Sequence, residues 1–201
     1  MDSTGDVQEF SRSWSVEVLK TPPLIAPARQ FIYPKQIAGE EDALARGALQ
    51  LIVHPANGGT FLATCALGFT DPAMLTGVFT CPNPNEICAV AGGYAYVVDT
   101  AQPEHCTHIA LKPVVEVQPL VAQGLLLFTG FHSMVAWGRN GIAWESARLS
   151  WEGVRITSID GDVLHGIGWN MVTDREVAFS LDLLTGRHQG GGFTPPQEKK
   201  S

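Results

Sequence analysis

The chain has 201 residues and a formal net charge of -7, with 13 Lys and Arg against 20 Asp and Glu. This acidic balance excludes a protein that binds nucleic acid through a basic surface regardless of sequence, because such proteins neutralise phosphates with clustered cations. Hydrophobic residues make up 45% of the chain and charged residues only 16%, so the composition predicts one folded domain and no extensive disorder.

The two ends of the chain differ in composition from the rest. Residues 1–13 are polar and aperiodic, and residues 194–201 are charged and contain two prolines. We expect a flexible N-terminus over 1–13, a single domain over 14–193 and a flexible tail over 194–201. The acidic start lacks the basic and apolar regions of a signal peptide, and turn residues interrupt both long uncharged stretches. A cytoplasmic protein that does not enter a membrane is therefore expected.

The four cysteines have no metal-binding or disulfide pattern. They are Cys65, Cys81, Cys88 and Cys106, and no two of them form a Cys-x-x-Cys pair. Cys65 and Cys88 lie in apolar runs, where a thiol usually serves as a small hydrophobic side chain. We predict four free thiols.

The first third of the chain alternates between extended and irregular segments. Residues 14–20 alternate apolar and polar side chains, which predicts a half-buried strand. Four prolines between 21 and 35 keep that segment extended and non-helical. The only helix candidate is residues 40–46, with acidic residues at its start and Arg46 at its end, and it could equally be a loop that leads into a strand.

From residue 47 onward, strands alternate with turns, and no long segment shows a helical period. The predicted strands are 49–53, 60–67, 77–80, 87–91, 94–98, 114–117, 125–129, 153–157 and 163–167. Asn140-Gly141 predicts a hairpin with a type I′ turn, in which Arg139 faces Ile142 and Trp137 faces Trp144. Asp160-Gly161-Asp162 predicts a second tight turn. The fold class is all-β.

A weak internal repeat runs through these strands. Gly92-Gly93-Tyr94, Gly130-Phe131-His132 and Gly168-Trp169-Asn170 follow one another at steps of 38 residues, each preceded by two predicted strands. Asn57-Gly58-Gly59-Thr60 is a candidate fourth copy. A period near 40 residues with four short strands per unit is typical of propeller blades.

Two short segments resemble the strand-plus-turn of β-propeller proteins in general: Val97-Val98-Asp99-Thr100, and Leu181 to Gly186. The resemblance covers roughly residues 47–190. It implies a small, about four-bladed β-propeller-like arrangement of antiparallel hairpins, with residues 14–20 supplying a missing outer strand. The Trp-Asp and Gly-His signatures of WD repeats are missing, so no particular family is indicated. The alternative architecture is a β-sandwich or irregular barrel.

Motifs for chemistry are sparse. His105-Cys106-Thr107-His108 contains the only cluster of candidate metal ligands, but a zinc site needs two such pairs. The sequence contains no nucleophile elbow, phosphate-binding loop or complete dinucleotide motif. We therefore predict no cofactor and no resident metal.

The repeat predicts a candidate binding face. In a propeller with strands in sequential order, the turns between second and third strands lie on the same face as the connections between blades. The residues that this places together are Tyr94, Phe131, His132, Trp151, Trp169 and Asn170. Aromatic rings grouped with polar tips suit recognition of a partner. Alternatively, Phe131 and Trp169 fill the centre of the propeller or cover blade edges.

Three functions remain open from the sequence. The leading hypothesis is a non-enzymatic binding or protein-interaction module whose partner is a protein or a small ligand. The second is a metal-binding protein or enzyme that uses His105 and His108, with or without His132. The third is a structural subunit of a larger assembly.

Overall fold

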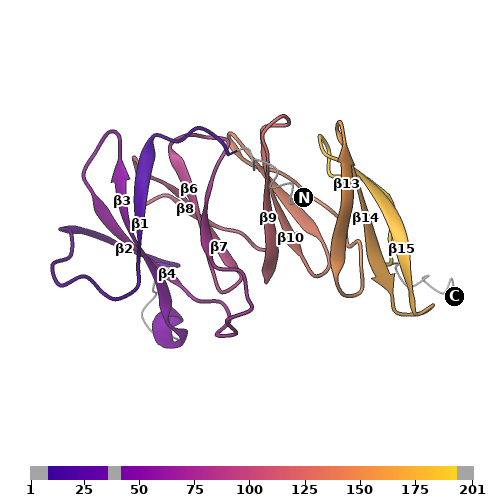
Figure 1. The fold of residues 1–201 in the computed structure, drawn as a ribbon, viewed down its shortest axis with the longest axis horizontal. Coiled ribbons are helices and arrows are strands. Elements are labelled where there is room, and N and C mark those ends of the chain that lie inside the picture. Colours follow the sequence, from indigo (N-terminus) through magenta and orange to yellow (C-terminus); the bar gives the residue numbers. More distant parts are fainter. Residues whose placement is uncertain (1–8, 36–41, 194–201) are drawn as a thin grey trace, which may run out of the picture.

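The computed structural model describes residues 9–35 and 42–193. These residues form sixteen strands and one 3-10 turn, with no α-helix in the described ranges, so the all-β prediction is confirmed (Figure 1). The tail predicted over 194–201, and residues 1–8 of the predicted N-terminal segment, lie outside the described residues. No helix in the described part of the chain is long and apolar enough to cross a membrane.

The strands form four sheets of four strands each. The first sheet has the order β1 (Trp14–Leu19), β3 (Ala48–Pro55), β4 (Phe61–Ala66) and β2 (Arg29–Tyr33). The second contains β5 (Gly77–Thr80), β6 (Glu86–Ala91), β7 (Tyr94–Asp99) and β8 (Cys106–His108). The third contains β9 (Val114–Leu120), β10 (Leu125–Gly130), β11 (Met134–Gly138) and β12 (Gly141–Glu145). The fourth contains β13 (Val154–Asp160), β14 (Val163–Asn170), β15 (Arg175–Asp182) and β16 (His188–Gly190).

The sheets are stacked face to face in chain order, and three apolar cores hold them together (Figure 1). One core lies between the first and second sheets, one between the second and third, and one between the third and fourth. This is the predicted propeller-like arrangement of about four blades. The row is open, because the first and fourth sheets lie at opposite ends of the molecule.

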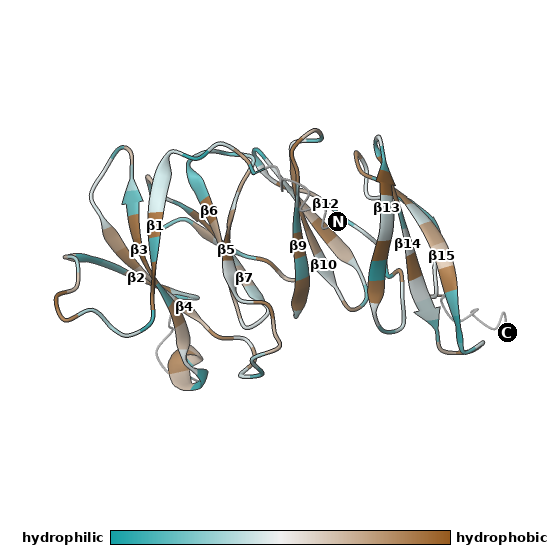
Figure 2. Ribbon diagram, in the orientation of Figure 1, coloured by the Kyte–Doolittle hydropathy of each residue, from teal (hydrophilic) through white to brown (hydrophobic). Residues whose placement is uncertain are grey.

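Burial along the strands reflects the position of each sheet in the row. β10 of the third sheet is buried at every residue, because both of its faces pack against neighbouring sheets. β14 of the fourth sheet alternates between buried and exposed or half-buried residues, as expected when one face packs and the other meets solvent. Figure 2, coloured by hydropathy, shows hydrophobic brown and hydrophilic teal segments along β13 and β15 of the same sheet.

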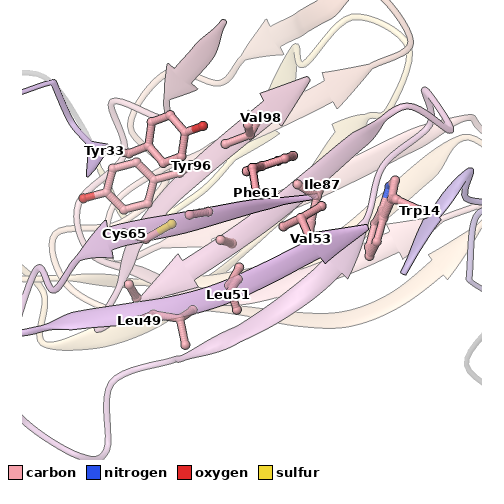
Figure 3. Close-up of a cluster of buried hydrophobic side chains, with 13 residues drawn as sticks. Trp14, Tyr33, Leu49, Leu51, Val53, Phe61, Cys65, Ile87, Tyr96 and Val98 are labelled. Carbon is pink, nitrogen blue, oxygen red and sulfur yellow. The ribbon is translucent and has the colours of Figure 1, made fainter. Parts of the chain in front are cut away.

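The first core joins the N-terminal strands to the second sheet. Figure 3 shows Trp14 at one end of this core and Tyr33 with Tyr96 at the other. Trp14 Nε1 donates to Glu86 O at 2.9 Å, and Tyr33 Oη donates to Pro103 O at 2.7 Å. β1, which the sequence predicted as an added strand, is an edge strand of the first sheet and pairs with β3.

The first sheet differs from the other three in strand direction. β2 pairs parallel with β4, whereas every other strand pair is antiparallel. Gly68 N donates to Ala91 O at 3.0 Å and Phe69 N to Gly92 O at 2.9 Å, so β4 ends beside the Gly92 turn. The β3–β4 turn, residues 56–60, therefore lies at the opposite edge of the first sheet, away from the Gly92 turn. The prediction that Asn57 to Thr60 is a fourth copy is wrong. A glycine-rich turn in the sequence indicates that the chain reverses its direction, but it does not indicate at which edge of the sheet the turn lies.

The repeated strand-plus-turn segments do form the same local structure in two sheets. Asp99 Oδ1 accepts from Ala101 N and Gln102 N after β7. In the fourth sheet, Asp182 Oδ1 accepts from Leu184 N and Thr185 N after β15. In each case the aspartate satisfies two backbone donors of the turn between third and fourth strands.

The hairpin at Asn140-Gly141 forms with a different register from the predicted one. Arg139 and Asn140 make the loop, and the pairing shifts between Ala136 and Trp137, so that Trp137 faces Ile142 and Ala136 faces Trp144. The predicted cross-strand pair of tryptophans is wrong, because this irregularity places the two rings on opposite faces of the sheet. Trp137 packs in the core between the second and third sheets, and Trp144 packs in the core between the third and fourth.

Two smaller predictions concern the helix candidate and the cysteines. A 3-10 turn, η1, spans Ala43–Arg46, and Asp42 accepts from Leu44 N at its start; Glu40 and Glu41 lie outside the described residues. All four cysteines are free, three of them buried and Cys106 half-buried. Burial raises the pKa of each thiol, that of Cys106 to about 12.

Candidate functional site

One edge of the stacked sheets, where the strands end rather than where the row ends, gathers the turns between second and third strands together with the connections between sheets. Val114 N donates to Gly93 O at 2.8 Å, which ties the connection from the second to the third sheet to the Gly92-Gly93 turn. Trp151 N donates to Trp169 O at 3.0 Å, which ties the next connection to the end of β14. We call this edge the connection face; it is the lower edge of Figure 1, where the coiled ribbon of η1 is drawn.

All six residues of the predicted binding face lie at this edge, but they do not form one group. Tyr94, at the start of β7, lies beside the first and second sheets. His132, Trp151 and Trp169 lie together at the third and fourth sheets, where Leu149 N donates to His132 O at 2.7 Å. Phe131 is 37% exposed on the turn between β10 and β11.

Arg148 is the centre of the second group, and it is absent from the binding residues predicted from the sequence. Its Nη2 donates to Trp151 O at 3.0 Å and lies 3.3 Å from His132 Nδ1. Its guanidinium carbon lies 4.9 Å from the ring centroid of Trp151 and 4.9 Å from that of Phe193. The expectation that connections between blades lie on this face could have identified Arg148, because it stands in the connection from β12 to β13.

Asn170 has a structural role in the turn that follows it. Its side chain is buried, and Oδ1 accepts from Val172 N at 2.9 Å and Thr173 N at 3.0 Å. The turn that it shapes exposes two apolar side chains, Met171 at 52% and Val172 at 81%. From the sequence, Asn170 is predicted as a binding residue, and the two exposed residues of its turn are not.

Phe131, Met171, Val172, Trp169 and Arg148 together define what we call the apolar patch of the connection face. Trp169 is half-buried, and its Nε1 donates to Asp174 Oδ1 at 3.3 Å. Aromatic residues, Met and Arg are the residue types enriched in the centres of protein interfaces. The arrangement can therefore bury apolar area against a partner while Arg148 supplies a fixed positive charge.

The group around Tyr94 has a different character. The Tyr94 ring lies flat against Gly68, where an added Cβ would stand 2.1 Å from a ring carbon. Lys112 Nζ lies 4.8 Å from the centroid of this ring, and His108 lies 5.2 Å from it. These side chains border a small cavity between the first and second sheets.

The three histidines of the metal or enzyme hypothesis are not brought together. His105 immediately precedes β8 and His108 ends it, and the two border different cavities, while His132 lies near Arg148, beside the third sheet. Within the ranges that the structure describes, no group of three or more His, Cys, Asp or Glu residues could hold a metal ion. The histidines therefore provide no ligand set of the kind that hypothesis needs.

Comparisons with protein families and with curated proteins find no match. Among solved structures, the chain is similar to the N-terminal domain of Nup159, with 10% sequence identity and a TM-score of 0.37. The match covers 96% of this chain and 54% of that one, so the chain spans about half the length of the protein it resembles. At this identity and TM-score, the likeness does not indicate a family or a function.

Proposed function

We propose that this chain is a non-enzymatic protein-interaction module and that the apolar patch of the connection face is its docking surface. The observation that carries the proposal is the exposure of Phe131, Met171 and Val172 on two turns of the connection face, the face that also carries Arg148 and half-buried Trp169. Exposed apolar side chains gathered on one face beside polar groups are typical of interaction sites.

The polar groups beside the patch already have partners within the chain. Arg148 bonds to the backbone of Ser150 and Trp151, and Asn170 bonds to the backbone of its own turn. These bonds hold the backbone of the patch in one conformation. A partner that docks there would lose little free energy to the ordering of loops, which favours binding by a preformed surface.

The fourth sheet offers a matched pair of variants for the test. Val172 and Leu184 occupy the same position after a turn-forming residue, since Val172 N donates to Asn170 Oδ1 and Leu184 N donates to Asp182 Oδ1. Their side chains are 81% and 65% exposed. Val172 lies on the connection face, while Leu184 lies at the other end of β15.

The experiment compares capture of proteins from native lysate by the wild type, Val172→Asp and Leu184→Asp, with quantitative mass spectrometry. We expect a partner that the wild type and Leu184→Asp capture equally and that Val172→Asp captures at least about tenfold less, the loss typical of a central interface residue. Both variants should keep the thermal unfolding of the wild type. Equal capture by all three proteins would refute the proposed surface.

A further inference from the structure

The outer face of the fourth sheet is open, whereas the outer face of the first sheet is largely covered. In the first sheet, Ile52, Leu62 and Thr64 point away from the core that this sheet shares with the second, and all three are buried. In the fourth sheet, every residue that points outward from β14 and β15 is exposed or half-buried. Among the described residues, no element lies beyond this sheet at its end of the row (Figure 1). A further layer can therefore pack on it.

Apolar side chains run along the middle of this outer face. Three of the four outward residues of β14 are apolar, Val163, Ile167 and Trp169, and Ala178 of β15 lies beside Ile167. Arg187, in the turn between β15 and β16, lines a hollow of about 510 Å³ on the same face together with Val163. Sheets in layered β folds pack through such faces, about 10 Å apart. The outer face of the fourth sheet thus has the residues that an interface between two sheets needs.

Charged residues flank the apolar middle in a pattern that is its own complement. At the end of the strands nearer the connection face, β13 carries Arg155 and β15 carries Glu176. Both side chains are exposed, and Arg155 Nη2 lies 3.2 Å from Glu176 Oε2. At the opposite end, β13 carries Asp160, and Arg187 stands beyond β15. Asp182 lies between these two, and its carboxylate accepts from two backbone N–H groups of the turn. The β13 side and the β15 side therefore carry opposite charges at each end.

A second copy of the same face is the partner that this charge pattern fits. Half a turn about an axis parallel to β14 exchanges the β13 side with the β15 side and leaves the two ends of the strands where they are. It sets Arg155 opposite Glu176 of the second copy, and Asp160 opposite Arg187 of the second copy. A two-fold dimer pairs one surface patch with itself in this way. Opposite charges across such an interface favour this register over others.

We propose that the chain forms a two-fold dimer in which the outer faces of the two fourth sheets pack on each other. Ile167, Trp169 and Ala178 form the apolar centre of this interface, and the charge pairs flank it. Two rows of four sheets become one row of eight. The dimer goes beyond the proposed docking function, because its interface consists of strand residues, whereas the apolar patch consists of turn and connection residues and meets this face at Trp169.

The test is sedimentation of the full chain over a series of concentrations. The wild type should reach twice the mass of one chain as its concentration rises. Arg155→Glu and Glu176→Arg should each raise the dissociation constant of the dimer at least about tenfold, because each sets like charges opposite each other at two places. An equimolar mixture of the two variants should recover the dimer, since the negative face of one variant then meets the positive face of the other.

Arg139→Glu is the matched control, because it makes the same change of charge on an exposed residue in the loop between β11 and β12. It should form dimers as the wild type does. A monomer at every concentration, equal weakening by Arg155→Glu and Arg139→Glu, or a mixture that recovers no dimer would overturn the proposal. Masses that grow beyond two chains would also overturn it, because they would indicate that the fourth sheet stacks on the first sheet of the next copy. Sedimentation needs no other protein, so the dimer and the docking surface can fail separately.

Discussion

Gly168→Ala should loosen the fourth sheet from the third. Gly168 lies in β14 and faces the connection between these two sheets. A Cβ added there would stand 2.5 Å from Leu149 O and 3.0 Å from Ser150 Cβ. Leu149 O cannot easily move away, because it accepts a hydrogen bond from Gly192 N at 2.7 Å. The added methyl group must therefore push the backbone of the connection and of β14 apart.

A matched variant isolates the size of this effect. Gly138, at the end of β11, is also a strand glycine, but a Cβ there would meet its nearest neighbour, Ala143 Cβ, at an ordinary 3.5 Å. Replacing a strand glycine by alanine gains about 0.5–1 kcal/mol in backbone entropy at either position. Overpacking costs about 1–3 kcal/mol at Gly168 alone. The difference between the two variants is therefore about 1–3 kcal/mol.

Thermal unfolding followed by circular dichroism measures this difference. For a domain of this size, 1 kcal/mol corresponds to about 2–4 °C in Tm, so Gly168→Ala should unfold several degrees below Gly138→Ala. Gly138→Ala should unfold at or slightly above the temperature of the wild type. If Gly168→Ala proves as stable as Gly138→Ala, the close packing of β14 on the connection is not a source of stability and the reasoning fails.

Two further predictions concern titratable groups in the cores. Burial raises the pKa of Glu86, although Trp137 donates a hydrogen bond to its carboxylate. The folded state therefore disfavours the carboxylate, and this cost to stability is fully present above the folded-state pKa and is lost as the pH falls from there to the lower unfolded-state pKa. Glu86→Gln, which keeps an acceptor for Trp137, should unfold at a higher temperature than the wild type at pH 7, and equal Tm values at pH 7 would contradict this. Titration of the denatured, unreduced protein should find four free thiols, whereas the native protein at pH 8 should react slowly because burial raises every thiol pKa. Two thiols or fewer would show a disulfide.

The parts of the fold that the sequence could predict are those governed by neighbouring residues. Tight turns at Gly92-Gly93 and at Asp160-Gly161 need residues that accept positive φ, and all three glycines adopt it. The 38-residue steps fall near the end of the second strand in the second, third and fourth sheets, because these sheets are built from consecutive hairpins; Gly92 follows β6, Gly130 ends β10 and Gly168 lies within β14. That the row of sheets is open could not be predicted. It depends on whether the outer faces of the first and fourth sheets meet, and the repeat in the sequence does not determine this.

The candidate site was predictable in position and less so in detail. The repeat placed His132, Trp151 and Trp169 at one end of the fold because turns and connections alternate regularly there. It could not show that Asn170 turns its amide inward to two backbone donors, so that Met171 and Val172 face solvent. That outcome depends on the local turn geometry, which an Asn in sequence permits but does not specify.

The strand order of the first sheet has a consequence for how the chain acquires its structure. In the other three sheets each strand pairs with the next one along the chain, so every pairing closes only a short loop. In the first sheet, Trp14 pairs with Pro55 and Arg29 pairs with Phe61, so β1 and β2 must wait until β3 and β4 have formed. Closing long loops slows folding because the entropy is lost before the contacts form. Within this chain β1 and β2 are therefore made before their partners, and during synthesis β1 remains unpaired until β3 has emerged and β2 until β4 has emerged.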